Sequence, residues 1–460
     1  MDFTDQRLVF RPGDDGYDAE IAGFQTGFRQ RPALVFAAGS ADDVVAAVSY
    51  AAEAGLPVGV QATGHGLPGA SEGGVLISTR RMDSVRIDAG ARTATVGAGV
   101  RWGQVIEAAA AHGLAPLNGS APGVGAVSYT LGGGLGILAR EFGYAADHVR
   151  WLDVVTADGT LRHVTPVDEP ELFGGLLGGG AHLGVVTALE IGLVPVARLY
   201  GGAIGFDGRQ VDPAAVLRAY EAWTRTVPDE VTSSVAALVY PDLPQLPPHL
   251  RGRYLVTVRV ASTVSEAAGE RLVAPLREIG PVVSDSLREM PYTESHTIHS
   301  DPDFPHSYHG DSVLVRELDV AAAGELLALT GPAADTMHVV QINHLGGALA
   351  KPADNAVPHR DAGWLVRVLS PFEPDAGSGG AALDAVRAVQ ERALGLFAPQ
   401  AVGRSLNFAF AAGEKIEGLT ADALYDAGTR KRLAGLKATY DPANLFRRNH
   451  GFSARGRAGG

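Results

Sequence analysis

The sequence predicts a fold of the α+β class, with a glycine-rich N-terminal part and a C-terminal part of longer helices and strands. Much of the chain's glycine, 59 residues in all, lies before residue 200, in bends beside short apolar segments. Near Val194-Pro195 glycine becomes rarer, and longer helical and strand-like segments begin. A chain of 460 residues is also too long for one ordinary hydrophobic core, so we expect two or three domains.

Composition and charge exclude several classes of function. Hydrophobic content of 46% and charged content of 19% are typical of a packed globular protein. The net charge of −13 argues against nucleic-acid binding and against docking on anionic membranes. The chain has no cysteine, which excludes disulfides, thiolate catalysis and cysteine metal sites. The N-terminus lacks a signal-peptide pattern and no apolar run spans a membrane, so we expect a soluble, cytoplasmic protein.

Residues 33–66 predict a strand–helix–strand unit of the size of a βαβ motif. Residues 33–36 form an apolar strand, and Ser40 is a good N-cap because Asp42 and Asp43 follow in the first turn. Gly55 ends the helix, and residues 58–60 form the second strand. This second strand leads directly into the stretch Q-A-T-G-H-G, residues 61–66, a glycine bend that contains one histidine.

The remaining pattern predicts short strands first and longer elements later. Strands are expected at 75–78, 85–88 and 93–96, a helix at 102–112, a glycine-rich loop at 119–136, and a hairpin of 152–155 with 161–164. Further on, helical spacing covers 213–224, 265–279, 320–329 and 383–396, and strands are expected at 254–260, 337–342 and 364–369. These later segments predict an antiparallel sheet covered by helices, and residues 425–452 predict a basic helix followed by a turn.

The glycine bends suit a ligand that needs close approach of the backbone. Glycine permits positive φ and close contact, and consecutive backbone N–H groups in a bend can bind phosphate. Residues 61–66, 119–126 and 131–136 fit this description, although each loop taken alone could be an ordinary tight turn. Neither a GxxxxGK(S/T) loop nor a GxGxxG with a following acidic residue occurs in good context, so a bound nucleotide would use another mode.

Several of these segments together resemble a known family. Within residues 31–195 they are Arg31-Pro-Ala-Leu-Val35, Asp43-Val-Val-Ala-Ala-Val48, Gly64-His-Gly66, Val96-Gly-Ala-Gly99, Leu131-Gly-Gly-Gly-Leu-Gly136, Val154-Val-Thr-Ala-Asp-Gly159 and Leu183-Gly-Val-Val-Thr187. Later matches are Leu345-Gly-Gly-Ala348, Pro358-His-Arg360 and the tail LKATYDPANLFRRNH at 436–450. In this order they resemble the bacterial, berberine-bridge-enzyme-like branch of the FAD-linked oxidases of the vanillyl-alcohol-oxidase superfamily.

The resemblance implies a domain organisation. Residues 1–197 would form a PCMH-type FAD-binding domain with two subdomains, and residues 198–402 an α+β substrate domain with an antiparallel sheet covered by helices. Residues 403–460 would return to the FAD domain.

The resemblance also implies how the cofactor is held. In the family, the histidine of the first glycine bend is bonded to the flavin 8α-methyl carbon, and His65 stands there, although Thr63 replaces a usual glycine. Some relatives add a second bond from a cysteine, but Ala121 occupies that position, so FAD would be covalent through His65 only. Val124, small and beside the flavin edge, favours an oxidase. The cofactor-binding residues implied are Gln61, Ala62, Thr63, Gly64, His65, Gly66, Gly119, Ser120, Ala121, Val124, Gly125, Tyr129, Gly134, Gly184, Val185 and Asn449.

The substrate side departs from the family. Relatives often place tyrosines on the strand that corresponds to 404–408, but Ser405 and Phe408 stand there and only Asn407 is kept. The neighbouring strand offers Arg367 or Leu369 where a carboxylate or amide is usual, and an arginine would bind a carboxylate or polarise an oxygen. Strand alternation puts Gln341 and Asn343 on one face, a possible cavity floor, with His344 on the other.

The segment 296–309 is rich in histidine but does not predict a metal site. Its histidine spacings are irregular and it contains Pro302 and Pro305, so we expect no metal. A substrate-facing loop is the better interpretation, with Tyr308 or one histidine as acid or base. Tyr129 could either hydrogen-bond flavin or substrate or fill space. The catalytic candidates are therefore Tyr129, Tyr308, Gln341, Asn343, Arg367 and Asn407.

The resemblance implies an FAD-dependent oxidoreductase, most simply an oxidase. It would transfer hydride from an alcohol, sugar-like or amine C–H to flavin N5, with O2 as acceptor and a small organic molecule as substrate, in secondary-metabolite tailoring. Two alternatives remain open. One is a flavoprotein that catalyses cyclisation, dehydration or rearrangement with little net redox change, and the other is a flavin-binding protein without catalytic activity.

Overall fold

The computed structural model describes residues 9–67, 71–248, 250–374, 380–409 and 421–447. A small sheet near the N-terminus has the strand order β1-β3-β6-β4. Helix α2 (Ala41–Glu53) begins where expected, because the Ser40 hydroxyl accepts the Asp43 N–H and the Asp43 carboxylate accepts the Ser40 N–H. The strands β3 (Leu34–Ala37) and β4 (Val58–Gln61) are confirmed; β6 (Val75–Ser78) lies between them, parallel to both, and β1 (Val9–Phe10) is antiparallel to β3.

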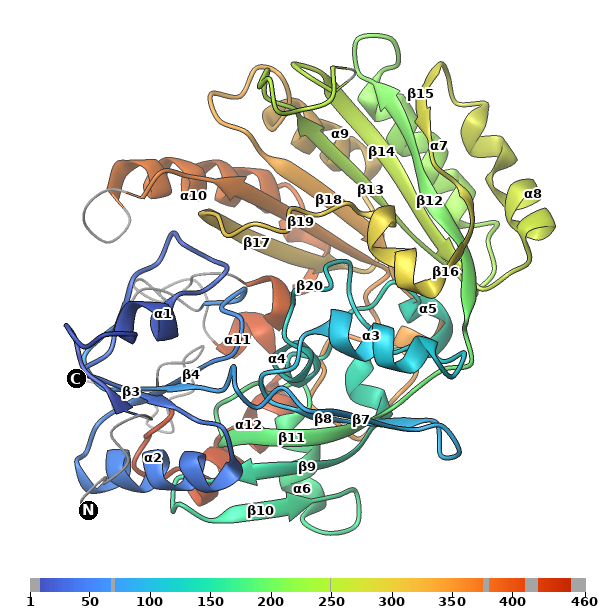
Figure 1. Ribbon diagram of the computed structural model, residues 1–460. Helices are drawn as coiled ribbons and strands as arrows, with labels where there is room; N and C mark the ends of the chain where they lie inside the picture. Colours follow the sequence, from blue (N-terminus) through green and yellow to red (C-terminus); the bar gives the residue numbers. More distant parts are fainter. Residues whose placement is uncertain (1–8, 68–70, 249, 375–379, 410–420, 448–460) are drawn as a thin grey trace.

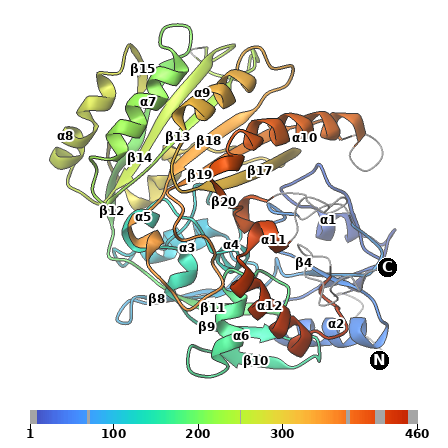
Figure 2. The ribbon, with the colours of Figure 1, turned by 180° about the vertical axis from the view of Figure 1, so that it is seen from behind.

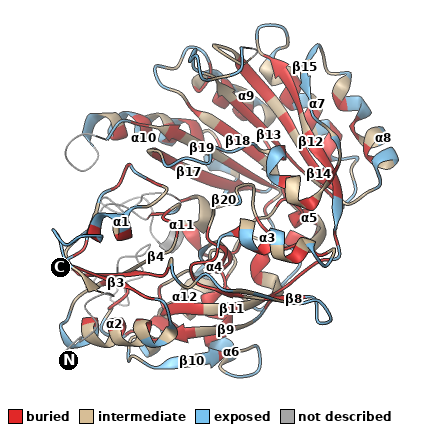
Figure 3. Cartoon of the chain, in the orientation of Figure 1, coloured by how far each residue is buried: buried red, intermediate tan, exposed pale blue. Residues whose placement is uncertain are grey.

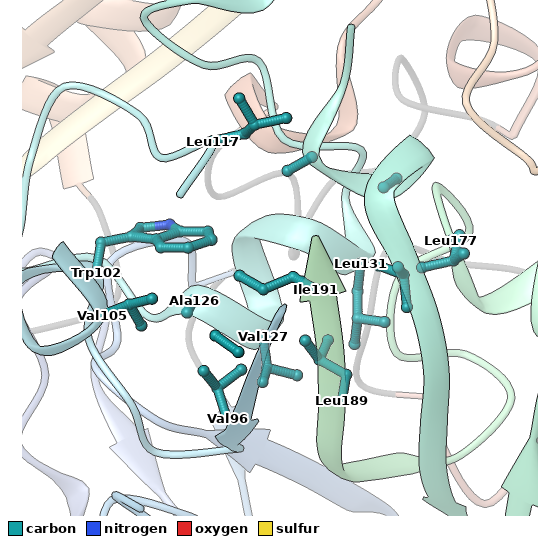
Figure 4. Packing of buried hydrophobic residues seen from close by; sticks show 14 of the residues in the cluster. Val96, Trp102, Val105, Leu117, Ala126, Val127, Leu131, Leu177, Leu189 and Ile191 are labelled. Atoms are coloured by element: carbon teal, nitrogen blue, oxygen red, sulfur yellow. The ribbon is translucent and has the colours of Figure 1, made fainter. Parts of the chain in front are cut away.

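A second sheet is antiparallel throughout, in the order β10-β9-β11-β8-β7. Its strands are β7 (Val85–Asp88), β8 (Thr93–Gly97), β9 (Val149–Val155), β10 (Leu161–Val164) and β11 (Val185–Gly192), which confirms the expected hairpins. The segment 119–136, expected as a loop, contains the helix α4 (Ala126–Leu131). Figure 4 shows why this short helix is stable: Val127 points between Val96 of β8 and Leu189 of β11.

The C-terminal part is built on a nine-stranded antiparallel sheet, in the order β15-β12-β14-β13-β18-β19-β17-β20 with β16 also paired to β12. Helices α7, α8, α9 and α10 lie over one face (Figure 1), and the other face looks toward the glycine-rich part. The strands are β12 (Arg198–Asp207), β13 (Val231–Val239), β14 (Tyr254–Ser262), β15 (Val282–Asp285), β16 (Arg288–Pro291), β17 (Tyr308–Val315), β18 (Val339–His344), β19 (Trp364–Pro371) and β20 (Ala401–Gly403).

The expected helices of this part are confirmed as α7 (Pro213–Thr224), α8 (Glu266–Arg277), α9 (Val320–Leu329) and α10 (Gly380–Gly395). The expected strand at 404–408 is wrong. After β20 ends at Gly403, the chain forms a short 3-10 turn, η5 (Leu406–Phe408), because the side chain of Asn407 is drawn across to the backbone of Tyr129.

The remaining elements complete the two parts. The C-terminal helix α12 (Ala427–Tyr440) packs on α6 in the glycine-rich part, and the Leu445 carbonyl accepts the Val58 N–H at 2.9 Å. Figure 2 shows this return of the chain from behind. The other helices are α1 (Tyr17–Ile21), α3 (Trp102–Ala110), α5 (Ala139–Phe142), α6 (Pro170–Leu176) and α11 (Ala421–Leu424), the 3-10 turns are η1 (Ala145–His148), η2 (Tyr292–Ile298), η3 (Gly347–Ala350) and η4 (Ala398–Gln400), and β2 (Gln30–Arg31) pairs with β5 (Ser71–Glu72).

Each of the three larger sheets has a hydrophobic cluster, and Figure 3 shows the buried residues concentrated along these sheets. None of the helices in the described ranges is long and apolar enough to cross a membrane. The two parts also share hydrophobic contacts, because Leu199, Tyr292 and Ile298 of the C-terminal part pack in the cluster of the second sheet.

Candidate functional site

A cavity of about 690 Å³ lies between the glycine loops and the open face of the nine-stranded sheet. This volume is in the range that holds cofactors and small ligands. One wall comes from the loops around residues 61–67 and 119–137, the floor comes from β13, β14, β18 and β19, and residues 298–308 form a further side. Segments far apart in the sequence thus meet at one site.

The first glycine loop is fixed by close backbone packing. Gly64 has φ of +69°, and a Cβ there would lie 2.6 Å from the Cα of Gly23. The N–H groups of Phe24 and Gln25 donate to the carbonyls of Thr63 and Gly64, at 2.9 and 3.0 Å. Glycine is required here because a side chain would both strain the left-handed backbone and push the two segments apart.

This loop presents His65 to the cavity in a defined orientation. Its ring stacks on Phe24 with 3.9 Å between ring centroids, and its Nδ1 shares a hydrogen bond of 2.8 Å with the Thr63 hydroxyl. The Tyr308 hydroxyl donates to the His65 carbonyl at 2.6 Å. Burial, with smaller effects of Arg101 and another histidine, lowers the pKa of His65 to about 4, so the imidazole is neutral at neutral pH.

The second loop brings small residues and one buried phenol to the cavity. Gly119, Ser120, Ala121 and Val124 line it, and α4 then carries Tyr129. The Tyr129 hydroxyl is buried and has no hydrogen-bond partner among the described residues. Burial raises the pKa of Tyr129 well above its ordinary value, so this group can act as a hydrogen-bond donor but not as a base.

Asn407 supports this loop from the tail. Its side-chain amide donates to the Tyr129 carbonyl at 2.9 Å. Gly132 lies so close that a Cβ there would be 1.7 Å from the Asn407 amide oxygen. Asn407 also lines the cavity, so it can contact a ligand while it holds the loop.

The register of the sheet places the polar side chains of the cavity floor next to one another. Gln341 lies directly opposite Arg367, and Asn343 lies opposite Ser234. The Arg367 guanidinium donates to the Gln341 side-chain oxygen and stacks over the Phe408 ring at 4.4 Å. Burial lowers the pKa of Arg367 to about 10, which leaves it protonated at neutral pH. His344 points away and shares a hydrogen bond of 3.1 Å with Arg140.

Sequence reasoning missed three groups of the cavity lining, Arg259 on the floor and His299 and Asp301 on the side formed by residues 298–308. Arg259 of β14 lies opposite Ser234 and donates to the His299 carbonyl at 3.2 Å. Asp301 accepts a hydrogen bond from the Ser120 hydroxyl. The signal for Arg259 was a single cation at an alternating position of the apolar strand 254–260. His299 and Asp301 lie in the histidine-rich segment, where the sequence predicted Tyr308 or one unspecified histidine as acid or base.

The surroundings of His299 and Asp301 set the protonation states of these two side chains at neutral pH. Burial is the main cause that lowers the pKa of His299 to about 3, so its imidazole is neutral. Burial raises the pKa of Asp301, but the charges of Arg259 and Arg367 and the hydrogen bond from the Ser120 hydroxyl oppose this effect, so the pKa of Asp301 is lowered and the carboxyl is ionised. Among the described residues, no group of three His, Cys, Asp or Glu side chains could hold a metal ion.

The structure brings most of the expected site residues together and leaves some apart. Gly134 and Gly184 do not line the cavity; a Cβ there would meet Tyr129 and Val154, respectively, so they allow packing behind the wall. Gly125 is the N-cap of α4, and Asn449 lies outside the described residues. The other expected residues line the cavity: Gln61, Ala62, Thr63, Gly64, His65, Gly66, Gly119, Ser120, Ala121, Val124, Tyr129, Val185, Tyr308, Gln341, Asn343, Arg367 and Asn407.

Comparison with known proteins points to the cofactor. The family described as an FAD binding domain matches residues 32–165. The chain is 29% identical to (R)-6-hydroxynicotine oxidase of Paenarthrobacter nicotinovorans over 98% of this chain and 97% of that protein. An FAD-linked oxidoreductase of Dictyostelium discoideum is 24% identical and covers 80% of each chain.

Solved structures agree with this comparison. The crystal structure of 6-hydroxy-D-nicotine oxidase from Arthrobacter nicotinovorans superposes with a TM-score of 0.83 and 28% identity, over 97% of this chain and 98% of that one. Glucooligosaccharide oxidase from Acremonium strictum shares the fold at a TM-score of 0.81, with 19% identity and 96% coverage of each chain. The cofactor of that oxidase is a 6-S-cysteinyl, 8α-N1-histidyl FAD.

The residues of the cavity fit FAD. A Cβ at Gly66 would meet no atom within 4 Å although the residue lines the cavity, so space is left against the backbone there. Two residues of the lining also carry buried polar atoms without a hydrogen-bond partner among the described residues, namely the Gln61 amide oxygen and the Tyr129 hydroxyl. Neither loop contributes a lysine or arginine to the described lining, so a pyrophosphate would be bound by backbone N–H groups.

Proposed function

We propose that this chain, which belongs to the FAD-linked oxidoreductases of the vanillyl-alcohol-oxidase superfamily, is an oxidase that removes hydride from a C–H bond beside an amine. The observation that carries the proposal is the cavity that joins the His65 loop to the polar floor of the sheet. Bound FAD would supply the hydride acceptor, flavin N5, and the route by which the electrons pass to O2 and give H2O2. The chain's own residues position the substrate and the cofactor.

The cofactor would be attached once, through His65. A neutral imidazole is the nucleophilic form, and the low pKa of His65 keeps it neutral. The backbone N–H groups of residues 61–66 and 119–124 would hold the rest of FAD. Because the chain has no cysteine and Ala121 lies in the second loop, a second link through a cysteine is chemically impossible.

The floor favours an amine over an alcohol. Hydride loss from an alcohol needs a base for the O–H proton, whereas a neutral amine can expel hydride with its own lone pair. Within the described part of the floor, Arg259 and Arg367 are cations and His299 has a pKa near 3, so none is an effective base. Asp301 is ionised, but its lowered pKa makes it a weak proton acceptor at neutral pH.

Tyr308 and the relatives support the same preference. The Tyr308 hydroxyl is already a donor to the His65 carbonyl, and burial raises its pKa, so it does not supply the missing base. The hydroxynicotine oxidase relatives are named for an amine. An amine is therefore the substrate class that can be oxidised without a base on the described floor.

O2 uptake and H2O2 release would test the oxidase function. Purified protein is mixed with panels of secondary amines and of matched alcohols, and O2 and H2O2 are both followed. We expect consumption of O2 and equal release of H2O2 with an amine. Product formed without either would refute the oxidase and support the second candidate, a cyclisation or rearrangement without net redox change, which the lack of an effective base in the described floor also permits.

Acid denaturation would test the attachment. Flavin should stay on the precipitated wild-type chain and be released from His65→Ala. His296→Ala replaces an exposed histidine and should retain the flavin. Free flavin in the wild-type supernatant would refute the covalent bond, while the FAD fold could persist.

A further inference from the structure

We propose that the floor of the cavity binds a carboxylate of the substrate between Arg259 and Arg367. The proposal rests on the oxidase function above, because it places the substrate in the same cavity. It assigns the substrate class: an amine that also carries a carboxylate. The proposal follows from the position of the two guanidinium groups and, within the described residues, from the lack of an ion pair to either of them and from an amide oxygen beside them that has no hydrogen-bond partner.

The two arginines extend over the same face of the sheet. Their strands, β14 and β19, are separated by β13 and β18, and Arg367 lies two residues along the sheet from the row of Arg259, which puts the two Cα atoms about 16 Å apart at ordinary strand spacing. Arg367 lies over the neighbouring strand, since its guanidinium donates to Gln341 of β18. Both side chains line the cavity, and their charges are close enough to influence each other. The space between their ends can therefore hold one small anion.

Neither guanidinium forms an ion pair with a carboxylate of the described ranges, although the charge of Asp301 is close enough to oppose the lowering of the pKa of both arginines. Within the described residues, the contacts of Arg367 are the neutral Gln341 side chain and the Phe408 ring, and Arg259 donates to the His299 carbonyl. Asp301 is the single described carboxylate of the cavity lining and accepts from Ser120. Two cations against one anion leave an excess positive charge, and a charge removed from water is costly unless it is paired.

An anion from the substrate would supply the missing partner. Guanidinium groups bind planar carboxylates through paired N–H donors, so two converging arginines favour this group. The FAD pyrophosphate is expected elsewhere, at the glycine loops, so it does not compete for these cations. Between the arginines, the Asn343 amide oxygen is buried and has no partner among the described residues. It can accept an N–H of the same substrate, which places the amine next to its carboxylate.

Calorimetric titration of the holoenzyme with benzoate and with benzamide would test the proposal. The two probes have nearly the same shape, but only benzoate is charged. We expect benzoate to bind at least about tenfold more tightly than benzamide, a difference of about 1.4 kcal/mol. Arg259→Gln and Arg367→Gln should each weaken benzoate binding about tenfold or more and leave benzamide unchanged. Arg367→Lys should retain part of the affinity because it retains the charge.

A matched control replaces an arginine outside the cavity. Arg288→Gln removes an exposed side chain of β16 that pairs with Glu294, and it should bind benzoate like the wild type. Flavin content is measured for each variant by absorbance after precipitation. Equal affinity for the two probes, or unchanged benzoate binding in both glutamine variants, would overturn the proposal. Loss of flavin from these variants would also overturn it, because the arginines would then bind the cofactor. O2 uptake with amines that do and do not carry a carboxylate tests the oxidase function separately from probe binding, so the two failures are distinguishable.

Discussion

Replacing Lys437 by methionine should destabilise the protein strongly and loosen the tail that supports the site. The Lys437 ammonium is buried, donates to the Asp441 carboxylate at 2.6 Å and donates to the His182 carbonyl at 2.9 Å. Burial lowers the pKa of Lys437, but the Asp441 partner opposes this effect. The Asp441 oxygens also accept the N–H groups of Leu445 and Phe446, at 2.6 and 2.9 Å.

The magnitude follows from what the substitution leaves behind. Removal of one partner of a buried pair costs about 3–5 kcal/mol, because the other charge stays buried and unpaired. Asp441 would keep two backbone donors, so we expect the lower end, about 3 kcal/mol. Leu445, whose N–H donates to Asp441, accepts the Val58 N–H at the start of β4. Strand β4 ends at Gln61, the first residue of the first glycine loop. The loss should therefore also reduce flavin retention.

Urea unfolding followed by tryptophan fluorescence would measure the change in the free energy of unfolding. Lys431→Met is the matched control, because Lys431 is exposed on the same helix, and it should change stability by less than about 0.5 kcal/mol. The double variant Lys437→Met with Asp441→Asn should recover part of the loss, since no unpaired charge remains. A loss for Lys437→Met as small as that of the control would refute the reasoning.

Three further predictions concern the first glycine loop and the pH response. Thr63→Val removes the hydrogen bond that orients His65, so the fraction of acid-stable flavin should fall, whereas Thr63→Ser should retain it. Gly64→Ala meets both the positive φ and the Gly23 backbone, so it should cost at least about 2 kcal/mol in urea unfolding; a neutral effect would contradict the packing. Burial, and then Arg140, lowers the pKa of His344 to about 3, below its value of about 6.5 in the unfolded chain, so the unfolded state binds the proton first as the pH falls. His344 should thus cost up to about 2 kcal/mol of stability between pH 7 and pH 5, and His344→Asn should show a shallower pH dependence by that amount.

Local signals made much of the fold predictable. The capping box at Ser40 and the Asp212-Pro213 start of α7 fix the two helix beginnings through contacts between near neighbours in the chain. The helix α4 was missed because its six residues are stabilised by packing between two strands rather than by their own pattern. The segment 404–408 has a strand-like pattern, but the hydrogen bond of Asn407 to a distant backbone carbonyl overrides it.

The two sides of the site differed in predictability for a physical reason. The cofactor side is formed by loops whose functional atoms are backbone groups, so a contiguous stretch such as Q-A-T-G-H-G contains the information. The substrate side depends on which residues face each other across β14, β13, β18 and β19. A strand's sequence gives its alternation but not its partner or register, so Arg259 could not be connected to Arg367 in advance.

The same difference has a consequence for how the site can change. Substitutions on the floor exchange side chains that stand on a rigid sheet, and their backbone hydrogen bonds are made whichever side chain is present. Substitutions in the first glycine loop alter the backbone itself, because Gly64 has no room for a side chain. Exchanges at positions such as Arg259 or Asn343 should therefore change which substrate binds while flavin content stays constant. Exchanges at Gly64 should reduce the flavin content for every substrate.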